Sequence, residues 1–181
     1  VLQTKDLTHS KLMDIMKSQE LDIAEEYVIQ HREMMRLSPS GLNTVRVVTQ
    51  EDKGSVIILA ARLRISINSH VDNLAAGNAA APSDPETGVV TGPAVFSDIT
   101  KPDITTHPVT GVEIPGFRIP LWPEVLELVR KAALMVPENR SVGWDIAITD
   151  SGPVLIEGNH NWCKLLWQLP VKKGLKKELE R

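Results

Sequence analysis

The sequence predicts an α+β domain built on a mainly antiparallel sheet with packed helices. Two pairs of strand-like apolar runs are each joined by a short turn, and one amphipathic helix lies between the pairs. The chain has 181 residues, of which 42% are hydrophobic and 24% charged. It is therefore long enough for one domain with a sizeable core.

Composition argues against several classes of function. The formal net charge of −3 gives no reason to expect nucleic acid as the main partner. No apolar run approaches the roughly 20 residues of a membrane span. A single cysteine, Cys163, excludes an internal disulfide framework and fits a reducing compartment, so we predict a cytoplasmic protein.

The first half of the chain predicts a short helix followed by a hairpin. Residues 10–17 have apolar side chains at helical spacing. The runs at 43–50 and 55–65 are rich in β-branched residues and are separated by the turn EDKG, which indicates an antiparallel hairpin. Residues 66–92 are rich in Asn, Ala, Gly, Pro and Asp, and predict a long loop of the kind that is often functional.

The second half predicts short strands and then the clearest helix of the chain. Between residues 89 and 120, strand-like runs are broken by turns. The segment WPEVLELVRKAALMVP has one apolar stripe and predicts a core helix that ends before Pro137. We expect residues 1–165 to form the domain and residues 166–181 to form a basic, partly helical tail.

The second hairpin, SVGWDIAITDSGPVLIEGN, carries acidic side chains inside an apolar run. A three-residue loop at 150–152, with its glycine in the left-handed conformation, would pair Thr149 with Pro153. Counting back from that pair places Asp145 directly opposite Glu157, with Cβ atoms roughly 5 Å apart. Like charges this close destabilise a sheet, so we expect a cation between them.

Asn159 shares a strand face with Glu157, because side chains two positions apart point the same way. Three oxygen-bearing side chains suit Mg²⁺, which commonly takes one or two carboxylates and adds water and phosphate oxygens. Two other interpretations stay open from the residues alone. The carboxylates could simply face water, or they could act as a general acid and base, which leaves the amide without a role.

Three arginines and one loop are candidates for binding an anion that accompanies the metal. Arg46 lies in NTVRVV, and Arg62 and Arg64 lie in AARLRI with the same parity, so both point to one face. An arginine inside an apolar strand must be paired or face a ligand, because burying it alone is costly. For Arg64 a cap on the solvent side is an equally good interpretation. Asn73, in DNLAAGN, fits either a ligand-binding loop or ordinary turn chemistry.

Six segments in order resemble an ATP-grasp domain, and more narrowly the sugar-transfer-associated ATP-grasp proteins, which are relatives of the α-L-glutamate ligases. The segments are EEYVIQH, NTVRVVT, AARLRI, SHVDNLAAGNAAAP, VGWDIAIT and VLIEGN. The resemblance covers roughly residues 21–161. It implies a split α+β fold that clamps ATP, and an acyl-phosphate formed from a small-molecule carboxylate and ATP. An amine or another nucleophile then attacks that acyl-phosphate.

The resemblance also implies roles for individual residues. The predicted ligands of Mg²⁺, for which Mn²⁺ is an alternative, are Asp145, Glu157 and Asn159. The residues predicted to contact ATP are Glu25, Glu26, Tyr27 and Val28 of the adenine hinge, with Arg46 in a supporting role. The residues predicted to act near the transferred phosphoryl group are Arg62 and Asn73.

The sequence departs from the family pattern upstream of the hinge. ATP-grasp proteins carry a glycine-rich phosphate loop and lysines there, and the roughly 24 residues before Glu25 contain no such loop. We therefore expect the C-terminal portion of the fold, with the N-terminal ATP-grasp region as a missing partner. Two hypotheses follow: an ATP-dependent ligase in the assembly of cell-surface polysaccharide or sugar conjugates, and a non-catalytic nucleotide-binding or interaction module or inactive fragment.

Overall fold

The structure is a computed structural model and describes residues 7–178. Its elements, with η for a 3₁₀ helix, are α1 His9–Ser18, α2 Arg32–Leu37, β1 Thr44–Asp52, β2 Ser55–Ile65, η1 Leu74–Ala76, β3 Ala79–Ser83, β4 Val95–Phe96, α3 Trp122–Met135, β5 Ser141–Thr149, β6 Gly152–Asn159, α4 Lys164–Gln168, η2 Leu169–Val171 and η3 Lys176–Glu178.

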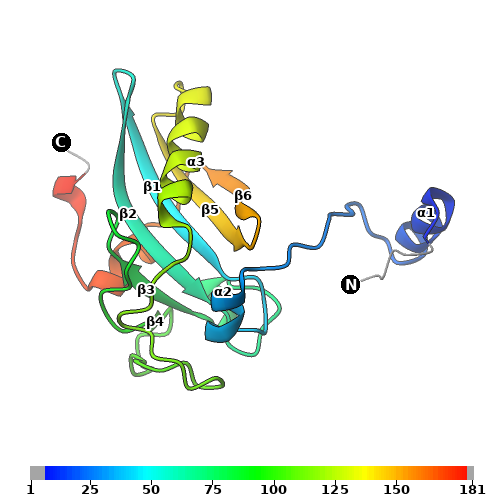
Figure 1. Cartoon of the computed structure of the whole chain (residues 1–181), viewed down its shortest axis with the longest axis horizontal. Helices are drawn as coiled ribbons and strands as arrows, with labels where there is room; N and C mark the ends of the chain where they lie inside the picture. The colour runs from blue at the N-terminus through cyan, green and yellow to red at the C-terminus, as the bar shows by residue number, and fades with distance from the viewer. Residues whose placement is uncertain (1–6, 179–181) are drawn as a thin grey trace.

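The strands form one six-stranded sheet in the order β4-β3-β2-β1-β5-β6. Every neighbouring pair is antiparallel. Helix α3 lies across one face of the sheet (Figure 1), and α4 packs against β2 on the other. The predicted α+β class with a mainly antiparallel sheet is confirmed.

Helix α3 and the sheet enclose the main core. Val125 and Val129 of the helix are fully buried in one cluster with Val47 of β1 and Ile146 of β5. The helix predicted from its apolar stripe at 122–137 is confirmed, although it ends at Met135. Because successive strand residues alternate, the neighbours of these apolar strand residues point to the opposite face. That face carries the candidate site.

The predicted long loop at 66–92 is wrong in part, because it contains η1 and β3. Strand β3 pairs with β2, with Ala81 opposite Leu63, and all five of its residues are buried. Its sequence, AAAPS, has neither β-branched side chains nor alternation. A strand buried on both faces needs no polar face, so the period of two that marks a half-buried strand is missing.

The second hairpin has a shorter turn than predicted. Thr149 pairs with Gly152, not with Pro153, so the turn has two residues. A bulge near Ile156 adds one residue to β6 and shifts the register. The bulge compensates for the turn, and Asp145 lies opposite Glu157 as predicted.

The C-terminal segment covers part of the second face. The rings of Trp162 and Trp167 meet edge to face with centroids 4.9 Å apart, and both pack with Val48 and Ala60. The predicted boundary between residues 165 and 166 falls inside α4, whose Leu166 and Trp167 are buried. The last residues of the predicted tail, 179–181, lie outside the described part of the chain.

Helix α1 confirms the short helix predicted at 10–17. Figure 1 shows it apart from the sheet, at the end of an extended segment that leads into α2. None of the helices within residues 7–178 is long and apolar enough to cross a membrane.

Replacing Gly143 by alanine is expected to destabilise the second face. A Cβ at this position would lie 2.6 Å from Cβ of Trp162, which is too short, and 3.0 Å from Cδ of Arg46, which is tighter than an ordinary contact. We expect Gly143→Ala to lower the free energy of unfolding by about 1–3 kcal/mol, the usual range for overpacking. Urea unfolding followed by tryptophan fluorescence measures this change. Gly174→Ala is the control, because nothing lies closer than 3.9 Å to its added Cβ.

Candidate functional site

Four charged side chains form a row across the second face of the sheet. In the strand register, Arg62 of β2 lies opposite Arg46 of β1, and Arg46 lies opposite Asp145 of β5. Asp145 in turn lies opposite Glu157 of β6. Residues directly opposite each other share a face, so the fold brings side chains far apart in the sequence into one line.

Asp145 is the centre of this row and is 2% exposed. Arg46 donates from Nε to Oδ1 and from Nη2 to Oδ2 at 2.8 Å, and Arg64 donates from Nη1 to Oδ2 at 2.6 Å. Burial by itself would raise the pKa of the Asp145 carboxyl. The hydrogen bond from Arg46 and the charges of both arginines outweigh burial and hold that pKa below its ordinary value.

Arg64 joins Asp145 to a second buried acid, Asp72. Its Nη2 atom lies 2.8 Å from Oδ1 of Asp72, whose Oδ2 accepts hydrogen bonds from the backbone and hydroxyl of Thr44. Burial raises the pKa of Asp72, and the charge of Arg64 opposes this rise only in part. The two acids differ because Asp145 has two arginine partners and Asp72 has one.

Glu157 and Asn159 lie at the exposed edge of the row, on β6. Nδ2 of Asn159 donates to Oε1 of Glu157 at 3.0 Å. Within residues 7–178, the amide oxygen of Asn159 has no hydrogen-bond partner. Asn159 pairs in register with Gly143, two positions before Asp145, so all three predicted metal ligands lie on one face.

The donor atoms of this set are those that a hard cation prefers. Asp145, Glu157 and Asn159 offer two carboxylates and one amide oxygen, which is a usual set for Mg²⁺ completed by water and phosphate. The described part of the chain contains no group of three or more His, Cys, Asp or Glu side chains that could hold a metal. Any site here therefore depends on the amide and on other oxygens, and the metal assignment stays a prediction.

A pocket of about 360 Å³ opens beside Asp145. It is lined by Leu42, Thr44, Arg64, His70, Val71, Asp72, Asn73, Asp145, Ile156 and Glu157. Asn73, predicted to act at this site, is therefore brought to it, and its Oδ1 accepts from the backbone of Ala75. Sequence reasoning missed Asp72, Thr44 and His70, although the acid directly before Asn73 was a usable signal.

Arg62 does not line this pocket. Nε and Nη2 donate to the carbonyl oxygen of Trp167 at 3.0 and 2.6 Å, and Nη1 donates to the carbonyl oxygen of Ala61. Desolvation lowers the pKa of Arg62 to about 10, so it stays charged at neutral pH. Its position anchors α4 to the sheet. For Arg64, the sequence left a cap on the solvent side and a role in ligand binding as equally good interpretations. In the structure, Arg64 is the arginine that lines the pocket.

The predicted adenine hinge lies apart from the pocket. Glu25, Glu26 and Tyr27 are exposed and Val28 is half-buried, all on the extended segment before α2. None of the four lines this pocket. Arg46, predicted to support ATP binding, is the buried partner of Asp145.

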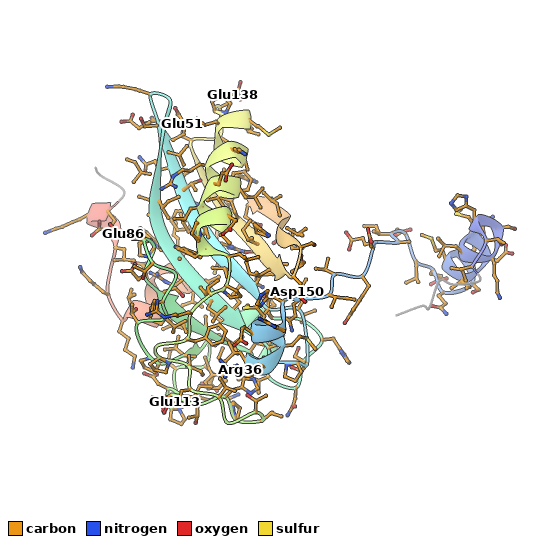
Figure 2. The ribbon with its side chains drawn as sticks, in the orientation of Figure 1. Arg36, Glu51, Glu86, Glu113, Glu138 and Asp150 are labelled. Atoms are coloured by element: carbon orange, nitrogen blue, oxygen red, sulfur yellow. The ribbon has the colours of Figure 1, made fainter. Side chains whose placement is uncertain are left out.

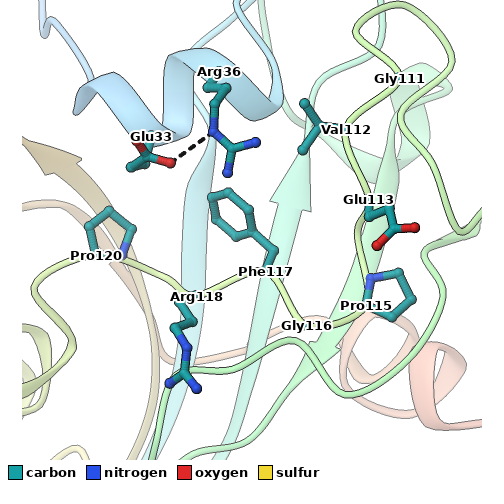
Figure 3. Close-up of a pocket in the computed structure, with 10 residues that line it drawn as sticks. All are labelled: Glu33, Arg36, Gly111, Val112, Glu113, Pro115, Gly116, Phe117, Arg118 and Pro120. Carbon is teal, nitrogen blue, oxygen red and sulfur yellow. Dashed lines mark hydrogen bonds and ion pairs between the residues drawn. The ribbon is translucent and has the colours of Figure 1, made fainter.

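A larger hollow of about 940 Å³ lies between α2 and the loop 111–120 (Figure 3). There Arg36 pairs with Glu33 at 2.8 Å and lies over the ring of Phe117. None of the predicted site residues lines it, and its Arg36–Glu33 pair is exposed and already formed. We therefore place the candidate site at Asp145, where buried charges meet a pocket.

Comparison with known proteins gives one match. The model of a family described as sugar-transfer associated ATP-grasp matches residues 4–181. Neither the curated proteins nor the solved structures yield a match. The family match spans all the residues of the row and of the pocket.

Asp145→Asn is expected to destabilise the fold in a pH-dependent way. The substitution leaves Arg46, which is buried, and Arg64, which is half-buried, without their full counter-charge. This loss should lower the free energy of unfolding by about 3 kcal/mol. Because the folded-state pKa of Asp145 is depressed, its contribution is present above the unfolded-state pKa of about 3.9 and is lost as pH falls through the folded-state pKa.

Denaturant unfolding of wild type and Asp145→Asn between about pH 3 and 8 measures this difference. It should be largest above about pH 5 and shrink below about pH 4. Asp22→Asn, on the exposed segment before α2, is the control and should give no such trend. A constant difference at all pH values would contradict the assigned ion pair.

Proposed function

The chain belongs to the sugar-transfer-associated ATP-grasp family, and from this premise we propose that it binds ATP together with a divalent cation at the Asp145 face of the sheet. Membership makes it an ATP-binding, ligase-like domain. The observation that carries the proposed location is the alignment of Asp145, Glu157 and Asn159 on one face beside a pocket that also holds Arg64.

The proposed reaction joins a carboxylate to an amine or another nucleophile. A carboxylate oxygen attacks the γ-phosphorus of ATP, ADP leaves, and the nucleophile displaces phosphate from the resulting acyl-phosphate. Both partners of the first step are anionic, so their repulsion must be offset. Mg²⁺, when bound, would supply charge neutralisation and alignment of the phosphates.

The residues of this chain would hold and orient the reactants. Asp145 and Glu157 supply negative charge to the cation, and Asn159 supplies a neutral amide oxygen. Arg64 places a positive charge on the pocket wall, where an anionic phosphate would lie. Arg46 fixes the orientation of the Asp145 carboxylate through two hydrogen bonds.

The substrate class rests on the family alone. A role in the assembly of cell-surface polysaccharide or sugar conjugates is proposed from the family description, and the carboxylate and the nucleophile are small molecules of unassigned identity. Use of ATP is consistent with the predicted cytoplasmic location. The separation of the predicted adenine hinge from the pocket supports the alternative function, a non-catalytic nucleotide-binding or interaction module or inactive fragment.

Glu157→Gln and Asn159→Ala are expected to weaken the binding of Mg²⁺-ATP by at least about tenfold each. Even residues that only support metal ligands are worth about 10- to 100-fold in metal affinity. Glu157 is exposed and Asn159 only half-buried, so these variants should keep the wild-type fold. Isothermal titration of the whole chain measures the affinity. Glu113→Gln, in the larger hollow, is the matched control.

An unchanged affinity in both β6 variants would remove the metal assignment. Catalysis is tested separately, by ADP release from Mg²⁺-ATP with small carboxylic acids and amines. A chain that binds Mg²⁺-ATP with the expected dependence on Glu157, but never releases ADP, would support the module.

A further inference from the structure

Asp145, the central predicted metal ligand, already has both carboxylate oxygens engaged. Oδ2 accepts from Nη2 of Arg46 and from Nη1 of Arg64, and Oδ1 accepts from Nε of Arg46. A carboxylate oxygen has two lone pairs, so Oδ2 is fully used. A divalent cation that binds through this atom must displace one of the two arginines.

The two arginines are held in different ways. Arg46 forms a two-point pair with Asp145, lies directly opposite it across β1 and β5, and does not line the pocket. Arg64 gives Asp145 only one hydrogen bond and divides its guanidinium between Asp145 and Asp72. It also lines the pocket. Arg64 is therefore the partner that can leave Asp145 without losing every counter-charge.

One donor of Arg64 remains unused. Its Nε atom is buried and has no hydrogen-bond partner in the described structure. A buried donor without an acceptor is unfavourable. A movement that gives Nε an acceptor is therefore favourable, and the guanidinium has a free donor for an incoming ligand.

We propose that Arg64 is an exchangeable counter-ion, which holds Oδ2 of Asp145 while no divalent cation is bound and releases it to the cation, remaining paired with Asp72. This inference rests on the proposed function. Released from Asp145, the side chain carries its positive charge and unused donors on the pocket wall, and the ligand that satisfies both is an oxyanion such as a phosphate.

The exchange couples two binding events. A cation entering alone meets the positive charge of Arg64 at close range, which opposes binding. A cation that enters with a polyphosphate brings acceptor oxygens for the released guanidinium. The attraction between Arg64 and these oxygens then offsets the repulsion between Arg64 and the cation. The site should therefore take a divalent cation weakly alone and much more tightly with an anionic ligand.

Arg64→Gln is expected to bind Mn²⁺ alone about tenfold more tightly than wild type, the order expected for removing a unit charge beside the metal. The same variant should bind Mn²⁺-ATP more weakly than wild type. Electron paramagnetic resonance of free Mn²⁺ measures the first affinity, and isothermal titration measures the second. An arginine with a merely structural role would weaken both.

Arg140→Gln is the matched control for net charge. Arg140 pairs with Asp52 at 3.5 Å, and its carbonyl oxygen accepts a hydrogen bond from the backbone N–H of Glu51. Figure 2 shows Glu51 at the upper end of the sheet, away from Arg36 and Asp150. This variant loses the same charge, and its affinity for Mn²⁺ should match that of wild type. An equal gain in both variants would overturn the proposal.

A second measurement follows the arginine side chains of the wild-type chain. In the wild-type chain, the ¹⁵N–H signal of the Arg64 side-chain Nε should shift on addition of Mg²⁺ with ATP, while that of Arg46 stays in place. Arg64→Lys assigns the signal, because it removes that Nε and keeps a positive charge. Shifts of both arginines, or of neither, would overturn the proposal.

The exchange of Arg64 and the binding of Mn²⁺-ATP are separated by two outcomes. If wild type binds Mn²⁺-ATP in a way that depends on Glu157, but Arg64→Gln leaves the affinity for Mn²⁺ alone unchanged or weaker, only the exchange is wrong. If wild type shows no affinity for Mn²⁺-ATP, the proposed function and the exchange are both wrong.

Discussion

The buried ion pair between Arg46 and Asp145 is the interaction on which the second face of the sheet depends. Neither charge tolerates burial alone, because removal from water is compensated only by a partner with good geometry. The strand register provides this geometry, since the two residues lie directly opposite each other on central strands. Arg64 bridges Asp145 and Asp72. Asp72 in turn accepts a hydrogen bond from the backbone of Thr44, so the loop that carries Asp72 is held against the start of β1.

The second face is divided between this charged network and an apolar cap. Trp162 and Trp167 cover the end of the face at Val48 and Ala60 and leave the pocket side open. Gly143 permits both parts to meet, because Trp162 and Arg46 each lie within 3.0 Å of where a side chain would start. Arg62 lies between the charged network and the apolar cap, where its guanidinium donates two hydrogen bonds to the carbonyl oxygen of Trp167.

Sequence reasoning recovered the parts of the fold that depend on local periodicity. The first hairpin, the core helix and the opposition of Asp145 and Glu157 were predicted, although the last followed from a turn that the structure replaces with a shorter turn and a bulge. Strand β3 was not predicted, because its alanine-rich sequence shows no alternation of apolar and polar residues and has low β-propensity. Its strand conformation is imposed by pairing with β2, which is information from outside the segment.

The candidate site shows a different limit. Parity places Arg62 and Arg64 on the same face, but it cannot distinguish them, because the difference arises from what covers each one. Helix α4, about 100 residues later in the chain, covers Arg62. Arg64 instead pairs with Asp72 and lines the pocket. The electrostatics of the site is thus set by three separated segments, around residues 44–46, 64–73 and 145–159. Arg64 lies where these segments meet. In the proposed exchange, the partners of its guanidinium depend on whether a cation, an anion or both are bound.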